Sequence, residues 1–258
     1  IVPTLISFGK DGKELDRIEG WNSEEWAEFL QIEIPETMVK YKPGCGSDTL
    51  APGMPEKLAA KYGDTVIKSR DIPLAEHEDE IEACYSRGWS DGLPVVPPTK
   101  ERVLRMLSGT TRHPQDIIGA IPPNLVECSV EKIAINAVLA GCLPQYLPVV
   151  IASVEAALQD EFCMHGLLAT TYFSGPLIIV NGPIAREIGM NAQGNVLGQG
   201  NRANSTIGRA LQLVIRNVGG GKPQEVDRSA FGTPGKVGFC FAEDEDGSYW
   251  ESLAQERG

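Results

Sequence analysis

The sequence predicts an α/β protein built from a short amino-terminal segment and a larger mixed α/β domain. Three observations favour this class: a β-rich start at residues 2–8, a run typical of a buried strand at residues 176–182, and several capped helical segments. We divide the chain into an amino-terminal fragment (1–32), a Pro/Gly-rich connector (33–75) and a main domain (76–258). A chain of 258 residues is long enough for this arrangement.

The amino-terminal fragment has the pattern of a β-hairpin followed by a helix. Residues 2–8 are β-rich, Lys10-Asp11-Gly12-Lys13 is a hairpin turn signal, and residues 14–19 alternate in character. Asn22 is a candidate N-cap for a helix over residues 23–31.

The main domain carries clear helix start and stop signals. Thr99 caps a predicted helix that reaches Leu107, while Ser129 and Gly141 mark the two ends of a predicted helix over 130–140. Three prolines within residues 89–99 forbid a regular helix there. The other expected elements are helices over 56–62, 76–87, 147–158, 183–188 and 205–217, and strands over 176–182 and 236–242.

Composition narrows the function classes. Hydrophobic residues make up 42% of the chain and charged residues 22%, which excludes wholesale disorder and fibrous repeats. The 23 Lys and Arg against 35 Asp and Glu give a net charge of -12, which argues against nucleic acid and anionic membrane as partners. The charge-free stretches 133–154 and 162–185 are interrupted by Asn and Pro, so we interpret them as buried core rather than membrane spans.

The six cysteines, at positions 45, 84, 128, 142, 163 and 240, form neither a CxxC motif nor a zinc-finger pattern. Such scattered thiols favour reduced cysteines and a cytoplasmic location. Cys45 lies between two glycines near Lys42, and we prefer an ordinary loop cysteine there over a reactive thiol. The sequence identifies no cofactor and no defined set of metal ligands.

A Gly- and Asn-rich stretch, residues 191–209, is the most informative candidate for a binding site. Gly198 and Gly200, together with Gly194, allow close backbone approach to a ligand, and a helix N-terminus follows them. Arg202 and Arg209 are seven residues apart, close to one helical face, and would bind a carboxylate or phosphate. The motif is neither GxGxxG nor a P-loop, so no nucleotide is implied. Three asparagines would orient the ligand: Asn136, Asn181 and Asn204. The alternative is a structural loop with surface arginines.

Three residues are candidates for catalysis. His165 lies in an uncharged stretch and would act as a general base, or else be a satisfied core histidine. Glu131 shares a helical face with Glu127 and would serve as an acid or base, or else stabilise a helix N-terminus. Cys142 would be a reactive thiol or an inert buried one. Glu243, after the last predicted strand, would pair with an arginine or join His165 at a metal.

Val2-Pro3-Thr4 at the head of a strand, followed by a D-G hairpin and a helix, resembles the C-terminal part of a thioredoxin-like fold. The resemblance covers residues 1–32 and implies a cis-proline at Pro3 beside a redox site. The redox CxxC of that family lies upstream of this proline. Either residues precede Ile1, or another surface completes the hairpin.

Three further segments resemble a bacterial family of unassigned reaction that is associated with UGSC-type selenoproteins. They are residues 91–99 (DGLPVVPPT), 130–142 (VEKIAINAVLAGC) and 201–209. The resemblance spans about residues 79–258 and brings no known catalytic residue.

We therefore predict a thiol- or redox-linked enzyme, an oxidoreductase or lyase, whose main domain binds a small anionic molecule. Arg202, Arg209 and His165 would meet in an apolar interior around that anion. A second hypothesis is a non-catalytic binding or assembly module, either a homo-oligomer or a chain completed by a partner at the amino-terminal fragment. A third is a metal-dependent hydrolase or lyase using His165 with Glu131 or Glu243.

Overall fold

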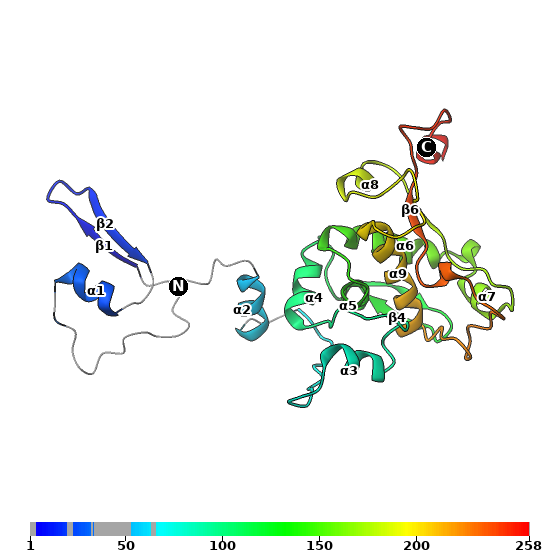
Figure 1. Ribbon diagram of the computed structural model, residues 1–258, viewed down its shortest axis with the longest axis horizontal. Helices are drawn as coiled ribbons and strands as arrows, with labels where there is room; N and C mark the ends of the chain where they lie inside the picture. Colours follow the sequence, from blue (N-terminus) through cyan, green and yellow to red (C-terminus); the bar gives the residue numbers. More distant parts are fainter. Residues whose placement is uncertain (1–3, 20–22, 32, 34–52, 63–65, 258) are drawn as a thin grey trace. The chain divides into compact units, whose positions relative to one another are not determined.

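The computed structural model describes residues 4–19, 23–31, 33, 53–62 and 66–257, which fall into two compact units, 1–63 and 64–258 (Figure 1). The boundary lies within the predicted connector. The described chain is mixed α/β with small two-stranded sheets, as predicted. Pro3 and Cys45 lie outside the described residues.

The first unit contains the predicted hairpin and helix. Strands β1 (Thr4–Phe8) and β2 (Glu14–Glu19) pair antiparallel, with Thr4 opposite Glu19. The turn closes through the Gly9 N–H, which donates to the Lys13 carbonyl at 2.8 Å. Two helices follow, α1 (Ser23–Leu30) and α2 (Met54–Tyr62). The hairpin and both helices are confirmed, whereas the thioredoxin-like identity of this fragment stays a prediction.

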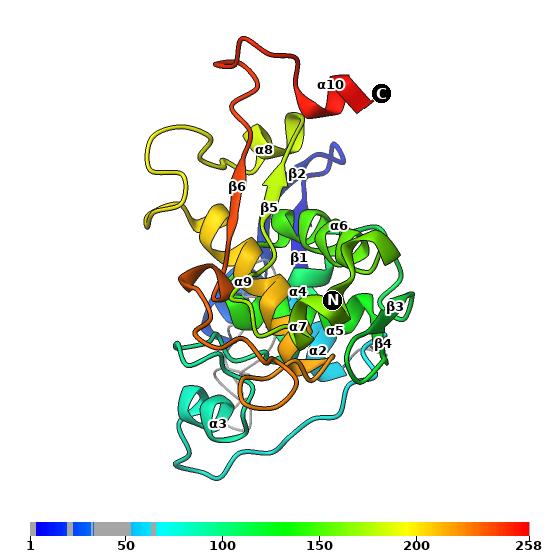
Figure 2. The same cartoon turned by 90° about the vertical axis from the view of Figure 1, so that its right-hand side faces the viewer.

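The core of the second unit is built around helices α5 (Val130–Ala140) and α9 (Arg202–Asn217), which pack against each other (Figures 1 and 2). Both bury nearly continuous apolar faces that include Ile133, Ile207 and Leu213. Helices α4 (Lys100–Leu107) and α6 (Leu147–Ala157) also pack against α5. Burial of these faces in one cluster is the main source of stability in this unit.

Shorter elements surround this core. The antiparallel pair is β3 (Ile117–Ile121) with β4 (Val126–Ser129), and the parallel pair is β5 (Ile178–Val180) with β6 (Cys240–Ala242). The remaining helices are α3 (Glu80–Ser86), α7 (Met164–Ala169), α8 (Pro183–Glu187) and α10 (Leu253–Arg257), with 3-10 turns at Pro144–Tyr146, Asp160–Phe162 and Pro234–Lys236. Among the described helices, none is both long and apolar enough to cross a membrane.

The predicted caps hold α4 and α5 in place. The Thr99 hydroxyl accepts from the Arg102 N–H, and the Ser129 hydroxyl accepts from the Lys132 N–H. Gly141 ends α5 in the left-handed region, with φ of 89°. Helix α9 begins three residues before the predicted position because the Asn201 side chain caps it at the Asn204 N–H.

Candidate functional site

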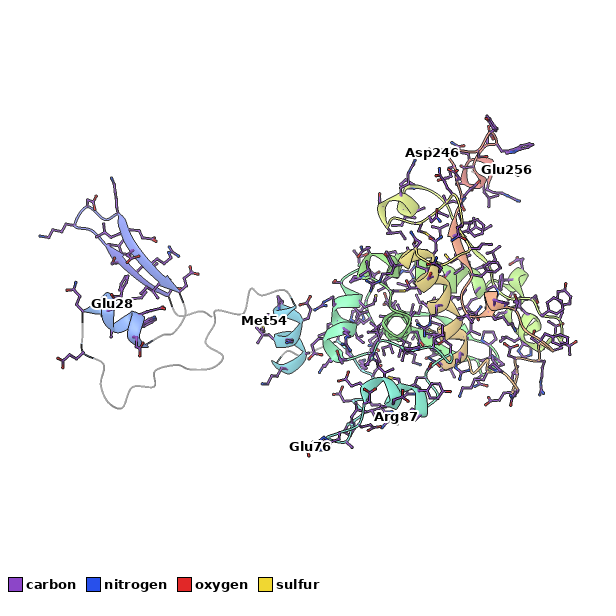
Figure 3. All side chains as sticks on the ribbon, viewed as in Figure 1. Glu28, Met54, Glu76, Arg87, Asp246 and Glu256 are labelled. Carbon is purple, nitrogen blue, oxygen red and sulfur yellow. The ribbon has the colours of Figure 1, made fainter. Side chains whose placement is uncertain are left out.

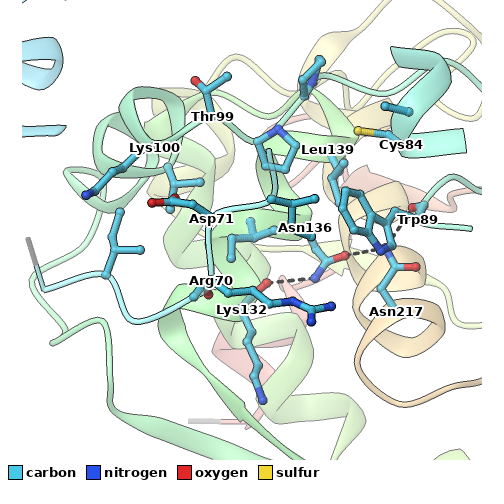
Figure 4. Close-up of a pocket in the computed structure, with 18 of the residues that line it drawn as sticks. Arg70, Asp71, Cys84, Trp89, Thr99, Lys100, Lys132, Asn136, Leu139 and Asn217 are labelled. Carbon is cyan, nitrogen blue, oxygen red and sulfur yellow. Dashed lines mark hydrogen bonds between the residues drawn. The ribbon is translucent and has the colours of Figure 1, made fainter. Parts of the chain in front are cut away.

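A cavity of about 720 Å³ lies within the second unit, lined by residues of α3, α4 and α5, the end of α9 and the extended segment 66–74 (Figure 4). We call segment 66–74 the pocket strap. The volume is typical of a small-molecule site. Much of the lining is apolar and includes Ile67, Ile72, Trp89, Val103, Ile135 and Leu139.

The charged lining residues are three cations and two carboxylates. The cations are Arg70, Lys100 and Lys132, and the carboxylates are Asp71 and Glu80. The Lys132 Nζ donates to the Glu127 carbonyl at 2.6 Å. The side chains of Arg70 and Lys100 have no hydrogen bond or ion pair to any other described residue. Their positive charges are therefore available to a ligand with an anionic group.

An amide network fixes one side of the cavity. The Asn136 amide donates to the Lys132 carbonyl at 2.9 Å, and its carbonyl oxygen accepts from the Asn217 amide at 2.9 Å. Asn217 also donates to the Trp89 carbonyl at 3.0 Å, and the dashed lines in Figure 4 trace this chain. The network joins α5, α9 and the segment that carries Trp89. The structure therefore places Asn136, a predicted ligand-orienting residue, on the cavity wall.

Glu131 does not line the cavity; it holds the pocket strap. Its carboxylate accepts from the backbone N–H groups of Lys68 (3.0 Å) and Ser69 (2.8 Å) and from the Gln115 amide (2.5 Å). Burial alone would raise the pKa of Glu131, but these donors outweigh it and hold the pKa below its usual value. A carboxylate with both oxygens occupied is poorly suited to transfer protons, which corrects its predicted role as an acid or base.

Arg209 is engaged in a mostly buried ion pair instead of an anion clamp. Its Nε and Nη2 donate to the Asp91 carboxylate at 2.7 and 2.8 Å, and Nη2 also donates to the Pro94 carbonyl at 3.0 Å. Burial opposes ionisation of Asp91, yet the Arg209 guanidinium holds the pKa of that carboxyl below its usual value. The expectation that Arg209 is free for a substrate is therefore wrong. The contact does join two segments of the predicted family resemblance, 91–99 and 201–209.

Arg202 and Cys142 both lie at the junction of α5 and α9. The exposed Arg202 donates from Nε to the Gly141 carbonyl at 3.0 Å. The buried Cys142 donates from Sγ to the Thr206 carbonyl at 3.4 Å, and burial raises the pKa of its thiol to about 11. A neutral, enclosed thiol is a weak nucleophile, so the geometry favours the inert reading of Cys142.

The accessibility of the thiols gives a direct prediction. Cys163 is exposed, whereas Cys84, Cys128, Cys142 and Cys240 are buried. We expect iodoacetamide at neutral pH to alkylate Cys163 at least about tenfold faster than these four, because burial both shields them and raises their pKa values. Time-resolved peptide mapping by mass spectrometry measures the rates. Labelling of Cys142 as fast as that of Cys163 would restore it as a candidate nucleophile.

The Gly/Asn-rich stretch is organised by its own side chains. The Asn204 amide donates to the carbonyls of Asn191 and Val196, and its oxygen accepts from the Asn191 N–H. Gly198 and Gly200 are exposed beside it. A hollow of about 40 Å³ next to Gly198 is far smaller than a typical small-molecule site. These contacts favour the alternative interpretation of residues 191–209 as a structural loop.

The remaining predicted residues do not gather around an anion. His165 is exposed on α7, which corrects the expectation of an apolar environment. Asn181 hydrogen-bonds to Glu243, which also accepts from the Leu253 N–H, so Glu243 pairs with neither arginine. In the part of the chain that the structure describes, no group of three or more His, Cys, Asp and Glu side chains is placed to hold a metal ion.

Sequence reasoning missed most of the cavity because the strap was assigned to the connector. A signal was present, since Ile67, Ile72 and Leu74 are apolar residues in a stretch otherwise rich in charge. Comparisons with family models, curated proteins and solved structures found no match to this chain. The two family resemblances therefore stay predictions.

Proposed function

We propose that the second unit binds a small molecule with an apolar body and one anionic group in the cavity beneath the pocket strap. The observation that carries this proposal is a cavity of ligand size in which the apolar lining adjoins Arg70 and Lys100, two cations whose side chains have no partner among the described residues. In Figure 4 the Arg70 side chain extends toward the side where Asn136 and Asn217 lie. The apolar body would lie against Trp89 and Ile135 while Arg70 meets the anionic group.

We further propose that this cavity is the substrate site of an enzyme in thiol or redox metabolism. The only cysteine among the cavity-lining residues that the structure describes is Cys84, whose carbonyl accepts from the Trp89 N–H at 3.0 Å. Burial raises the pKa of the Cys84 thiol, so it would meet a ligand as a neutral thiol. Cys84 lines the cavity and Cys142 does not, so Cys84 is the thiol that a ligand in this cavity would meet. The predicted homo-oligomer remains compatible with this proposal, and the stacked, exposed rings of Tyr172 and Phe173 would suit such a contact.

Two fluorescent probes test the binding proposal. The first, 8-anilinonaphthalene-1-sulfonate, has an apolar body and a sulfonate, and the second, N-phenyl-1-naphthylamine, has the same body without the charge. We expect Arg70→Gln to weaken binding of the sulfonate three- to tenfold, since solvent screens an exposed cation, and to leave the neutral probe unchanged. Fluorescence titration measures both affinities.

Two further variants complete this test. Arg228→Gln removes another exposed arginine outside the cavity lining and is expected to change neither affinity. Ile135→Trp places an indole in the cavity and is expected to reduce binding of both probes. Wild-type binding of both probes by a folded Ile135→Trp variant would place their site elsewhere and reject the proposal.

A further inference from the structure

The pocket strap is attached to the rest of its unit by very few hydrogen bonds. Within the described chain, residues 66–74 form no backbone-to-backbone hydrogen bond. They are held by the Lys68 and Ser69 N–H groups, which donate to Glu131, and by the Val66 carbonyl, which accepts from the Gln115 amide at 3.0 Å. Ile67 adds packing against the core. One carboxylate and one amide therefore define the position of this wall.

Glu131 is unusual because it is a buried charge without a cation. It is 2% exposed, it lies in the first turn of α5, and no described Lys, Arg or His forms an ion pair with it. Its charge is balanced by hydrogen-bond donors of Lys68, Ser69 and Gln115, aided by the helix N-terminus. Such a carboxylate is costly to bury unless every donor stays in place. The position of the pocket strap therefore depends on the Glu131 carboxylate, and the burial of that carboxylate depends on the donors of the strap.

The same arrangement sets the position of Arg70. Arg70 directly follows Ser69, whose N–H is bound to Glu131 at 2.8 Å, and both residues line the cavity. Because Glu131 itself does not line the cavity, it would act on a ligand only through the strap. A glutamine at this position would keep the size of the side chain, but its NH2 group would face N–H donors and leave at least one of them unpaired.

We propose that Glu131 is a positioning residue of the ligand site: its carboxylate fixes the pocket strap as a wall of the cavity and so holds Arg70 where it meets the anionic group. The effect on the ligand rests on the function proposed above. The effect on the strap does not, and it is measured separately.

The first experiment measures the strap without any ligand. In the full chain, Glu131→Gln is expected to accelerate amide hydrogen exchange at Lys68 and Ser69 at least about tenfold, while the amides of the α5 interior keep their protection. Glu131→Asp keeps the charge but shortens the side chain by one methylene. The exchange rates of Lys68 and Ser69 in this variant should lie between those of wild type and those of Glu131→Gln. The matched control is Glu127→Gln, which removes an exposed carboxylate four residues away. It should leave the exchange rates of Lys68 and Ser69 unchanged. Unchanged exchange at Lys68 and Ser69 in Glu131→Gln would overturn the inference whether or not a probe binds.

The second experiment is a double-mutant cycle with 8-anilinonaphthalene-1-sulfonate. If Glu131 acts through Arg70, Glu131→Gln weakens binding three- to tenfold, and adding Arg70→Gln weakens it little further. A residue with only a structural role would lower thermal stability and leave the affinity of the folded protein unchanged, which would overturn the positioning role. Failure of the wild type to bind the probe, with faster exchange in Glu131→Gln, would reject the proposed function but leave the anchoring of the strap established.

Discussion

Replacing Arg209 with alanine is expected to lower the free energy of unfolding of the second unit by about 3–5 kcal/mol, as observed when one partner of a buried ion pair is removed. The two side chains are only 14% and 12% exposed. The substitution leaves the Asp91 carboxylate buried without its cation and frees the carbonyls of Leu93 and Pro94, which Arg209 now binds. Urea unfolding followed by circular dichroism measures the change.

The pH dependence of this variant checks the mechanism. Asp91 has a lowered pKa in the folded state, so its contribution is fully present above its unfolded pKa of about 3.9 and is lost as the pH falls through the folded value. The loss in free energy of unfolding on removing Arg209 should therefore be largest at neutral pH and smallest in acid. Arg186→Ala is the control, because Arg186 on α8 and Asp246 form a pair that is 65% and 75% exposed, and Asp246 lies apart from the helical core (Figure 3). Equal losses of unfolding free energy in Arg209→Ala and Arg186→Ala would contradict a special contribution of the buried pair.

Gly109→Ala is expected to lower the free energy of unfolding by about 3 kcal/mol or more and the melting temperature by roughly 6–12 °C. A Cβ at this position would lie 1.8 Å from the carbonyl oxygen of Pro144 and 2.5 Å from its carbonyl carbon. Both are backbone atoms at the start of the turn that leads into α6, so no side-chain rotation relieves the overlap. Differential scanning calorimetry measures the change.

Gly194→Ala is the matched control for Gly109→Ala. No atom lies within 4 Å of the position that its Cβ would take. We expect a change of stability within about 0.5 kcal/mol. Equal effects of the two substitutions would show that chain flexibility, and not the close approach to Pro144, determines the cost.

Local signals in the sequence were sufficient for most elements of the fold. Thr99, Ser129 and Gly141 act as the predicted caps, because capping depends on hydrogen bonds within a few residues. The β3–β4 hairpin was not predicted, since Ile117–Ile121 is short, contains a glycine and ends at two prolines. Its pairing also includes a register shift between Ile117 and Gly119, which masks the alternation that reveals a strand.

The site was harder to predict because it depends on long-range partners. The sequence gives no sign that Arg209 will meet Asp91, 118 positions away, and an arginine near a helix start is then easily taken for a ligand-binding group. Glu131 was misread for the same reason, since its two backbone donors, Lys68 and Ser69, lie more than 60 residues before it. Asn136 lines the cavity from the buried face of α5, a helix whose two ends the sequence marks, while its predicted role toward a ligand stays a prediction.

The attachment of the strap also has a mechanical consequence. Residues 66–74 are the first described part of the second unit after the boundary between residues 63 and 64. Any tension transmitted along the backbone from the amino-terminal side is borne by the hydrogen bonds to Glu131 and Gln115 before it reaches α3. Pulling on the chain at that junction would thus detach the pocket strap and open the cavity before the helical core unfolds.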